Sequence, residues 1–260
     1  MLRLEKARLG GQRRRTVGYA TKIIGPLLKP EMFYLKTALI KNCCGDCACG
    51  CVVVGLAISL INGSRYVRDM VVSVQKAAGL MLFVGGAQWI LANIVSEALY
   101  PGYSINLNWI SDLGVGPSAA VFNTSMIALG ALTLAAAYCL HYALNRRLFT
   151  VALTLVGIGA VGVGIFNENY IAPHTVFALT TFIFSAVSAF ASSRFINPPF
   201  RRLSILAGAI VLAALVLLGA QVHLGIGNGG MERMVAYPAV LWMLGFGGYF
   251  MADPTVPFPG

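Results

Sequence analysis

The side chains best suited to chemistry in this sequence are ionisable groups and one hydroxyl near the ends of long apolar segments. They are Glu97, Ser111, Asp112, Glu168, His174, His223 and Arg233. All lie in or next to three connectors between apolar segments, so one end of a helical bundle would carry them together. Glu232 falls in the same region but is not assigned to the site. This convergence predicts a polar pocket that binds a lipid headgroup or a small polar ligand.

Two other chemistries could use the same residues. His174 and His223 with Asp112 or Glu168 could bind a divalent metal and leave a position open for water, as a metal-dependent lipid-modifying hydrolase requires. Ser111, a histidine and Asp112 could instead form a nucleophile set. The spacing of these residues matches no established catalytic motif, and each residue could equally be a structural anchor at the end of a helix. These alternatives stay open, and the sequence assigns no cofactor.

A separate candidate metal site is a cluster of cysteines near the N-terminus. All but one of the 6 cysteines lie between residues 43 and 51. The candidate ligands are Cys44, Cys47, Cys49 and Cys51. Thiolates at Cys-x2-Cys spacing can hold zinc or an iron-sulfur cluster. A structural zinc site normally has a second Cys or His pair at a distance, which this segment lacks, so cysteines without a metal are the alternative.

Glu97 needs a partner because of where it lies. It follows Asn93 by one helical turn, so both side chains can project into a bundle from one face. A carboxylate near a helix C-terminus is disfavoured by the helix dipole, and an unpaired charge in hydrocarbon costs about 2.5 to 3.5 kcal/mol. The available basic side chains are Arg233, His174 and His223. We expect Glu97 to contact one of them or to be protonated.

The elements that must position these residues are transmembrane helices. The chain has 260 residues, of which 58% are hydrophobic and 11% charged, and its mean hydropathy is +0.77. Six apolar segments are long enough to cross about 30 Å of hydrocarbon at 1.5 Å per residue. They are residues 77–99, 119–140, 148–166, 171–191, 203–224 and 235–251. Their patterns lack the alternation of barrel strands, so we predict an all-α, polytopic transmembrane helical bundle.

The distribution of basic residues predicts the orientation of this bundle. Basic residues cluster before the first segment, after the second, and between the fourth and fifth; they are Arg65, Arg68, Lys76, Arg146, Arg147, Arg194, Arg201 and Arg202. Of the 19 Lys and Arg residues, only Arg233 falls in the opposite connectors at 100–118, 167–170 and 225–234. By the positive-inside rule, both termini are cytoplasmic and the candidate site faces outward in the cell membrane. The net charge of +10 is then a topology signal and predicts no nucleic-acid partner.

The first 69 residues form a basic, cysteine-containing N-terminal extension to the six-helix domain at 70–252. The apolar stretch from Cys51 to Ile61 is about half as long as a membrane span, so a seventh span is not expected. Three interpretations remain: a basic arm on anionic lipid, a half-inserted helix, or sequence upstream of a true start at Met70. Residues 253–260 are predicted to be a short cytoplasmic tail. The sequence does not predict an oligomeric state.

Several motifs resemble one known family. Asn108 to Gly114 (NWISDLG), Phe122-Asn123 and Gly164 to Glu168 (GIFNE), with His174 six residues further on, resemble domain-of-unknown-function family 998 (DUF998). The resemblance covers residues 77–252 and implies a six-helix membrane protein of a mostly archaeal and bacterial family. It also implies a distant relation to eukaryotic membrane proteins of lipid handling, which favours a membrane lipid as partner. A small transporter is the further alternative, although Gln88, Asn93, Thr154 and Gln221 are the few polar residues expected near mid-membrane.

The predicted orientation can be tested with an impermeant thiol reagent on intact cells. In a cysteine-free background, single cysteines at Ser104 and Asn228 should react, because both positions lie in the connectors that lack a basic cluster. A cysteine at Asn145, beside Arg146 and Arg147, should react only after the cells are permeabilised. The reverse labelling pattern would contradict the orientation.

Overall fold

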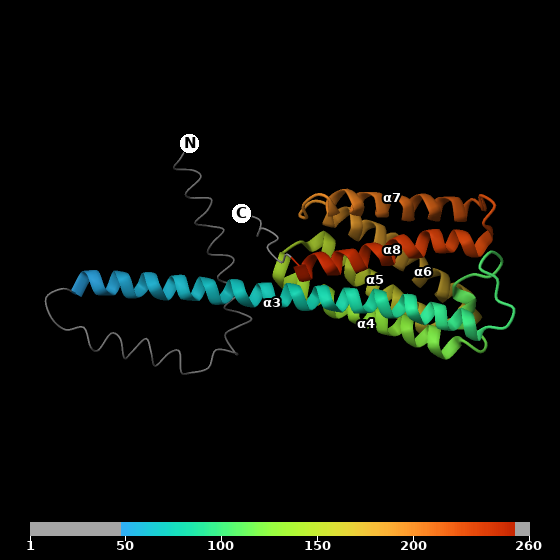
Figure 1. Cartoon of the computed structure of the whole chain (residues 1–260), viewed down its shortest axis with the longest axis horizontal. Coiled ribbons are helices and arrows are strands. Elements are labelled where there is room, and N and C mark those ends of the chain that lie inside the picture. Colours follow the sequence, from blue (N-terminus) through green and yellow to red (C-terminus); the bar gives the residue numbers. More distant parts are fainter. Residues whose placement is uncertain (1–47, 253–260) are drawn as a thin grey trace. The chain divides into compact units, whose positions relative to one another are not determined.

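The computed structural model describes residues 48–252, with side chains from residue 69 onward (Figure 1). Most of the predicted basic extension and the tail at 253–260 lie outside the described residues. Cys44 and Cys47 lie outside them too, and for Cys49 and Cys51 only the backbone is described. The cysteine metal site therefore stays a prediction.

Every regular element in the described part of the chain is a helix. The long helices are α3 (Ala48–Leu99), α4 (Ala119–Leu144), α5 (Arg147–Ile165), α6 (Ile171–Ser192), α7 (Phe200–Gly219) and α8 (Gly227–Ala252), with short 3-10 turns η1 (Ser111–Gly114) and η2 (Glu168–Tyr170). Six stretches are long and apolar enough to cross a membrane, the first of them being Asp69–Leu99 within α3. This confirms the predicted all-α bundle of six membrane-spanning helices. Cys51 and Ile61 belong to α3 and form no separate helix.

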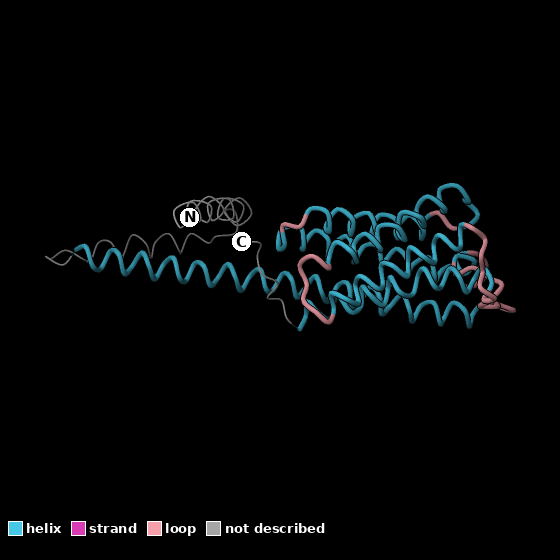
Figure 2. The backbone as a smooth tube through the Cα atoms, turned by 90° about the horizontal axis from the view of Figure 1, so that it is seen from above, coloured by secondary structure: helices cyan, strands magenta, loops and turns pink. Residues whose placement is uncertain are grey.

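The helices of the bundle run side by side (Figures 1 and 2), and small residues allow them to approach closely. Neighbours in sequence pack together from α4 to α8, and α6 also contacts α8. The tightest approach of α4 to α5 is at Gly130, where an added Cβ would lie 2.6 Å from the backbone oxygen of Gly157 and from the backbone nitrogen of Val161. Backbone atoms cannot rotate away, so this position requires glycine.

An aromatic core fills the part of the bundle opposite the 100–118 connector. Phe246 of α8 is fully buried, and its ring lies within 5.2 Å, centroid to centroid, of the rings of Phe149 and Trp242. Phe195, Phe200 and Phe250 complete this cluster. The aromatic packing therefore concentrates at the end of the bundle where α8 finishes, and leaves the polar residues at the end where α8 begins.

Two of the predicted helix boundaries that differ from the structure, the end of α7 and the start of α8, change the site. Helix α7 ends at Gly219, well before the predicted end at Leu224, because Gln221 and Leu224 adopt left-handed backbone angles with φ of 58° and 48°. Gln221 is therefore an exposed turn residue and does not lie near mid-membrane. Helix α8 begins at Gly227, before the predicted start at residue 235. Glu232 and Arg233, predicted in a connector, lie on a buried face of this helix.

Glycines explain why α8 starts so early. The Gly229 N–H donates a hydrogen bond of 3.2 Å to the carbonyl oxygen of Asn106, so the first turn of α8 lies directly on the 100–118 connector. A Cβ on Gly229 would lie 1.9 Å from the carbonyl oxygen of Asn108, which leaves no room for any other residue. The glycine-rich run, which reads as a turn in the sequence, is thus a helix start packed against a loop.

Replacing Gly130 with Ala should destabilise the bundle, and replacing Gly248 with Ala should not. Both positions are helical, and Ala is favoured over Gly in a helix by about 1 kcal/mol. At Gly248 nothing lies within 4 Å of the added Cβ, so the higher helix propensity of Ala determines the change in stability, and G248A should not be destabilising. At Gly130 the clash with α5 should cost about 1 to 3 kcal/mol. Thermal unfolding in detergent should show a lower Tm for G130A alone; equal effects of the two variants would contradict this packing.

Candidate functional site

Arg233 of α8 ties together the end of α3, the 100–118 connector and α8 itself. Its Nη2 lies 2.6 Å from Glu97 Oε1 and donates a 2.7 Å hydrogen bond to the Tyr103 hydroxyl. Its Nη1 donates to the carbonyl oxygens of Ile105, at 3.2 Å, and Gly229, at 3.0 Å. The guanidinium also lies 5.5 Å from the centroid of the Tyr103 ring. Arg233 is only 7% exposed, so its charge depends on these partners.

The contact with Glu97 confirms the expectation that this carboxylate pairs with a basic side chain. Tyr103 strengthens the arrangement because its hydroxyl donates a 2.8 Å hydrogen bond to the carbonyl oxygen of Trp109, within the same connector. Burial raises the pKa of Tyr103 to about 12, so the phenol keeps its proton and remains a donor at neutral pH. Sequence analysis does not predict this role for Tyr103.

Three carboxylates and one hydroxyl meet beside this ion pair; we call Ser111, Asp112, Glu168 and Glu232 the acidic cluster. Glu232 accepts a hydrogen bond from the backbone N–H of Ile110, and Glu168 accepts one from the hydroxyl of Ser111. Ser111 Oγ also lies 3.4 Å from Glu232 Oε1. The carboxyl group of Glu168 lies against that of Asp112. Residues from η1, η2 and α8 thus converge, although they lie far apart in the sequence.

Asp112 fixes the shape of the connector that carries Ser111. Its Oδ2 accepts a hydrogen bond of 2.9 Å from the backbone N–H of Trp109 and one of 3.0 Å from the side chain of Asn108. Asn108 in turn accepts a 3.0 Å hydrogen bond from the backbone N–H of Ser104. These local bonds hold the turn into η1, and they explain why the Asn-Trp-Ile-Ser-Asp stretch positions the hydroxyl of Ser111 towards Glu168.

The carboxylates of the acidic cluster form no salt bridge in the part of the chain that the structure describes. There, Arg233 and Glu97 form the single salt bridge. A carboxylate placed in an apolar bundle without a counter-charge costs several kcal/mol. Glu232 is 8% exposed and bears most of this cost. The acidic cluster could therefore accommodate a positively charged group.

His174 contributes one further acceptor. Its Nδ1 lies 2.8 Å from the carbonyl oxygen of Phe166, and because a carbonyl can only accept, Nδ1 carries the proton. In a neutral imidazole this leaves Nε2 as an acceptor. His174 is 8% exposed, and it lines a cavity together with Ser111 and Glu232.

His223 is not hydrogen-bonded to this group. It lies in the irregular turn after α7, and its Nε2 is buried without a hydrogen-bond partner among the described residues. No hydrogen bond joins His223 to Asp112 or His174, so their predicted convergence stays a prediction. Residues 69–252 hold no group of three His, Cys, Asp or Glu side chains placed to bind a metal ion. The Ser111 hydroxyl donates to Glu168 and has no hydrogen bond with a histidine among the described residues, so the nucleophile set stays a prediction.

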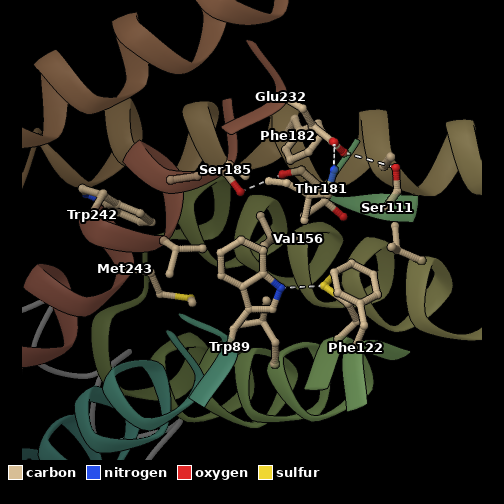
Figure 3. Close-up of a pocket in the computed structure, with 18 of the residues that line it drawn as sticks. Trp89, Ser111, Phe122, Val156, Thr181, Phe182, Ser185, Glu232, Trp242 and Met243 are labelled. Atoms are coloured by element: carbon tan, nitrogen blue, oxygen red, sulfur yellow. Dashed lines mark hydrogen bonds between the residues drawn. The ribbon is translucent and has the colours of Figure 1, made fainter. Parts of the chain in front are cut away.

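A cavity of about 70 Å³ leads from the acidic cluster into the bundle (Figure 3). Its polar end consists of Ser111, His174 and Glu232, and its remaining wall is mainly apolar. The wall includes Trp89, Phe122, Met126, Leu129, Leu153, Val156, Phe182, Ala236, Val240, Trp242 and Met243. These residues come from α3, α4, α5, α6 and α8, so only tertiary packing brings them together.

The polar groups along the apolar wall are already satisfied within the protein. The hydroxyls of Thr181 and Ser185 donate to carbonyl oxygens of their own helix, at 2.9 Å and 2.7 Å. The indole N–H of Trp89 donates to the sulfur of Met126 at 2.9 Å. The cavity is therefore polar at one end and apolar along its length. Sequence analysis does not predict this cavity, and it does not assign Glu232 to the site.

Six apolar helices, a connector fastened by a buried ion pair and an internal cavity define a multi-pass α-helical membrane protein. The family model described as "Protein of unknown function (DUF998)" matches residues 83–249. The match spans more than half of the chain, and the protein belongs to this family. Comparisons with curated proteins and with solved structures give no match.

Breaking the Arg233–Glu97 pair should show strong coupling between its two residues. Arg233→Met leaves Glu97 buried without a counter-charge, and losing one partner of a buried pair typically costs about 3 to 5 kcal/mol. Glu97→Gln should also lower the Tm in detergent, and the double variant should lose less than the sum of the single effects. Arg201→Met, at an exposed position of α7, is the matched control and should leave the Tm unchanged. Additive losses would mean that the pair does not hold the connector.

Proposed function

We propose that this protein binds a membrane amphiphile, with part of its hydrocarbon tail in the cavity and its polar head at the acidic cluster. The observation that carries the proposal is the cavity itself, which is apolar along its length and ends at Ser111, His174 and Glu232. This combination matches a molecule with one apolar and one polar part. A purely polar ligand would leave the apolar wall unused.

The dimensions of the cavity suit a segment of a lipid tail. Its lining residues on α8 extend from Glu232 to Met243, which corresponds to about 16 Å at 1.5 Å per residue. That length is about half of the hydrocarbon thickness of a bilayer. The volume of about 70 Å³ compares with roughly 10 to 15 Å³ for one water-sized group, so the cavity has room for several methylene-sized groups in a row.

The orientation inferred from the sequence places the head of this ligand at the outer surface of the cell membrane. The basic residues Arg146, Arg147, Arg194, Arg201 and Arg202 lie at the ends of α4 to α7 opposite the acidic cluster. The positive-inside rule assigns that basic end, and both termini, to the cytoplasm. The ligand is then a lipid or lipid-like molecule that reaches the protein in the outer half of the bilayer.

The contacts of the remaining polar residues argue against the transporter alternative. Gln88 donates hydrogen bonds of 3.0 Å to the carbonyl oxygens of Gly85 and Ser125, and Asn93 donates to that of Trp89 at 2.9 Å. The NH2 groups of both amides are engaged with the helix backbone, and of the two residues only Asn93 keeps a buried oxygen without a hydrogen-bond partner. A transport pathway needs more polar groups that are free to face the substrate. The metal-dependent hydrolase has no assembled metal-binding group among the described residues to support it.

Filling the cavity should remove the bound amphiphile. Ala239→Phe adds a ring to the cavity wall, and Leu241→Phe, two residues away on the same helix, adds one at a position that is 59% exposed. Native mass spectrometry of protein purified in mild detergent should detect a co-purified amphiphile in the wild type and in L241F. In A239F the occupancy should fall by about tenfold, a difference of about 1.4 kcal/mol. Equal occupancy in a correctly folded A239F, or no retained amphiphile in the wild type, would overturn the proposal.

A further inference from the structure

We infer that the head of the ligand is cationic; this inference rests on the proposed function. The ligand that suits this site is a single-chain amphiphile with a protonated primary amine and with no phosphate or carboxylate. The inference comes from the hydrogen-bonding groups and the charges at the polar end of the cavity. It assigns a chemical class to a ligand that the cavity alone leaves open.

The polar end of the cavity offers acceptors and lacks donors. Glu232 uses one carboxylate oxygen for the N–H of Ile110, and the contact of its other oxygen with Ser111 is long, at 3.4 Å. In its neutral form, His174 presents Nε2 as an acceptor, since its proton lies on Nδ1 and is donated to the carbonyl oxygen of Phe166. The Ser111 hydroxyl donates to Glu168. An ammonium group brings three donors and no acceptor, so it matches this arrangement.

Arg233 forms no salt bridge with Glu232 and does not line the cavity, although the two residues are adjacent in the sequence. Its Nη1 and Nη2 are occupied by Glu97, Tyr103 and two backbone carbonyls, whereas its Nε is buried without a hydrogen-bond partner among the described residues. The other Lys and Arg side chains of the described residues lie towards the opposite end of the helices, at Lys76, Arg146, Arg147, Arg194, Arg201 and Arg202. Helix α4 between the two ends has 26 residues, a length of about 39 Å. No Lys or Arg of the described residues therefore lines the cavity to hold a phosphate.

The two side chains with free acceptors are buried and line the cavity. Glu232 and His174 are each 8% exposed, and both line the cavity. A group bound between them would lie where the tail enters the apolar part. A negatively charged head would meet the carboxylate of Glu232, which forms no salt bridge, so the site discriminates by repulsion as well as by attraction.

The head must also supply most of the selectivity. Lipid tails are already surrounded by hydrocarbon in the bilayer, so moving a tail from lipid to an apolar cavity brings little hydrophobic gain. Amphiphiles with the same tail and different heads should therefore differ strongly in affinity. This separates the inference about the head from the proposal about the tail.

The test compares three straight-chain probes of equal length: a primary amine, an alcohol and a carboxylic acid, each titrated into the purified full-length protein in nanodiscs of uncharged lipid. Affinities come from competition with a fluorescent alkyl probe. The wild type should bind the amine at least about tenfold more tightly than the alcohol, a difference of about 1.4 kcal/mol, and should bind the acid most weakly.

Substitution then assigns the effect to the acidic cluster. Glu232→Gln should bring the affinities for amine and alcohol to within about twofold, while alcohol binding persists because the cavity is intact. Asp69→Asn removes one carboxylate from an exposed position near the start of the first span and should keep the full amine preference. If Glu232→Gln does not fold, Glu168→Gln gives the second measurement, with a weakened preference expected.

The outcomes separate the two proposals. Equal binding of amine and alcohol by the wild type, or an amine preference that survives both Glu232→Gln and Glu168→Gln, overturns the cationic head and leaves the tail proposal standing. Tighter binding of the acid than of the amine also overturns it. Failure of all three probes to compete in the wild type overturns the proposed function itself.

Discussion

The contact on which the rest of the polar site depends is the buried pair of Arg233 and Glu97. It joins α8 to the end of α3, and through Tyr103 and Ile105 it also fastens the 100–118 connector onto the bundle. An arginine inside an apolar bundle needs several acceptors, and here a carboxylate, a phenol and two carbonyls provide them. With the connector fixed in this way, Ile110 and Ser111 reach the carboxylates of Glu232 and Glu168.

One consequence of that pairing is an imbalance of charge nearby. Since Arg233 pairs with Glu97, the carboxylates of Asp112, Glu168 and Glu232 form no salt bridge within the described part of the chain. Neighbouring residues of α8 thus have different roles: Arg233 holds the structure together, and Glu232 leaves an acceptor at the end of a cavity. Structural polar groups and unused polar groups can be told apart only by following each hydrogen bond to its partner.

The connector between α3 and α4 contains a motif that resembles the family and also forms part of the candidate site. Its Ser-Asp-Leu-Gly stretch carries the resemblance to DUF998, and it forms η1 at the polar end of the cavity. Asp112 is used within the connector, for Trp109 and Asn108, whereas Ser111 extends to η2. In the sequence, Ser111 and Asp112 resemble part of a nucleophile set. In the structure, Asp112 stabilises the conformation of the connector.

Composition and spacing alone determined the membrane class, the six helices and the grouping of ionisable residues at one end, because apolar length and charge placement are local properties of the chain. They also predicted a basic partner for Glu97. They did not predict the early start of α8, since the space that makes Gly229 necessary comes from Asn108 in another segment. Nor did they predict that α7 ends at Gly219, before the left-handed residues Gln221 and Leu224 and so before His223. The cavity, and the roles of Glu232 and Tyr103, depend on packing between distant helices, and only the tertiary structure decided them.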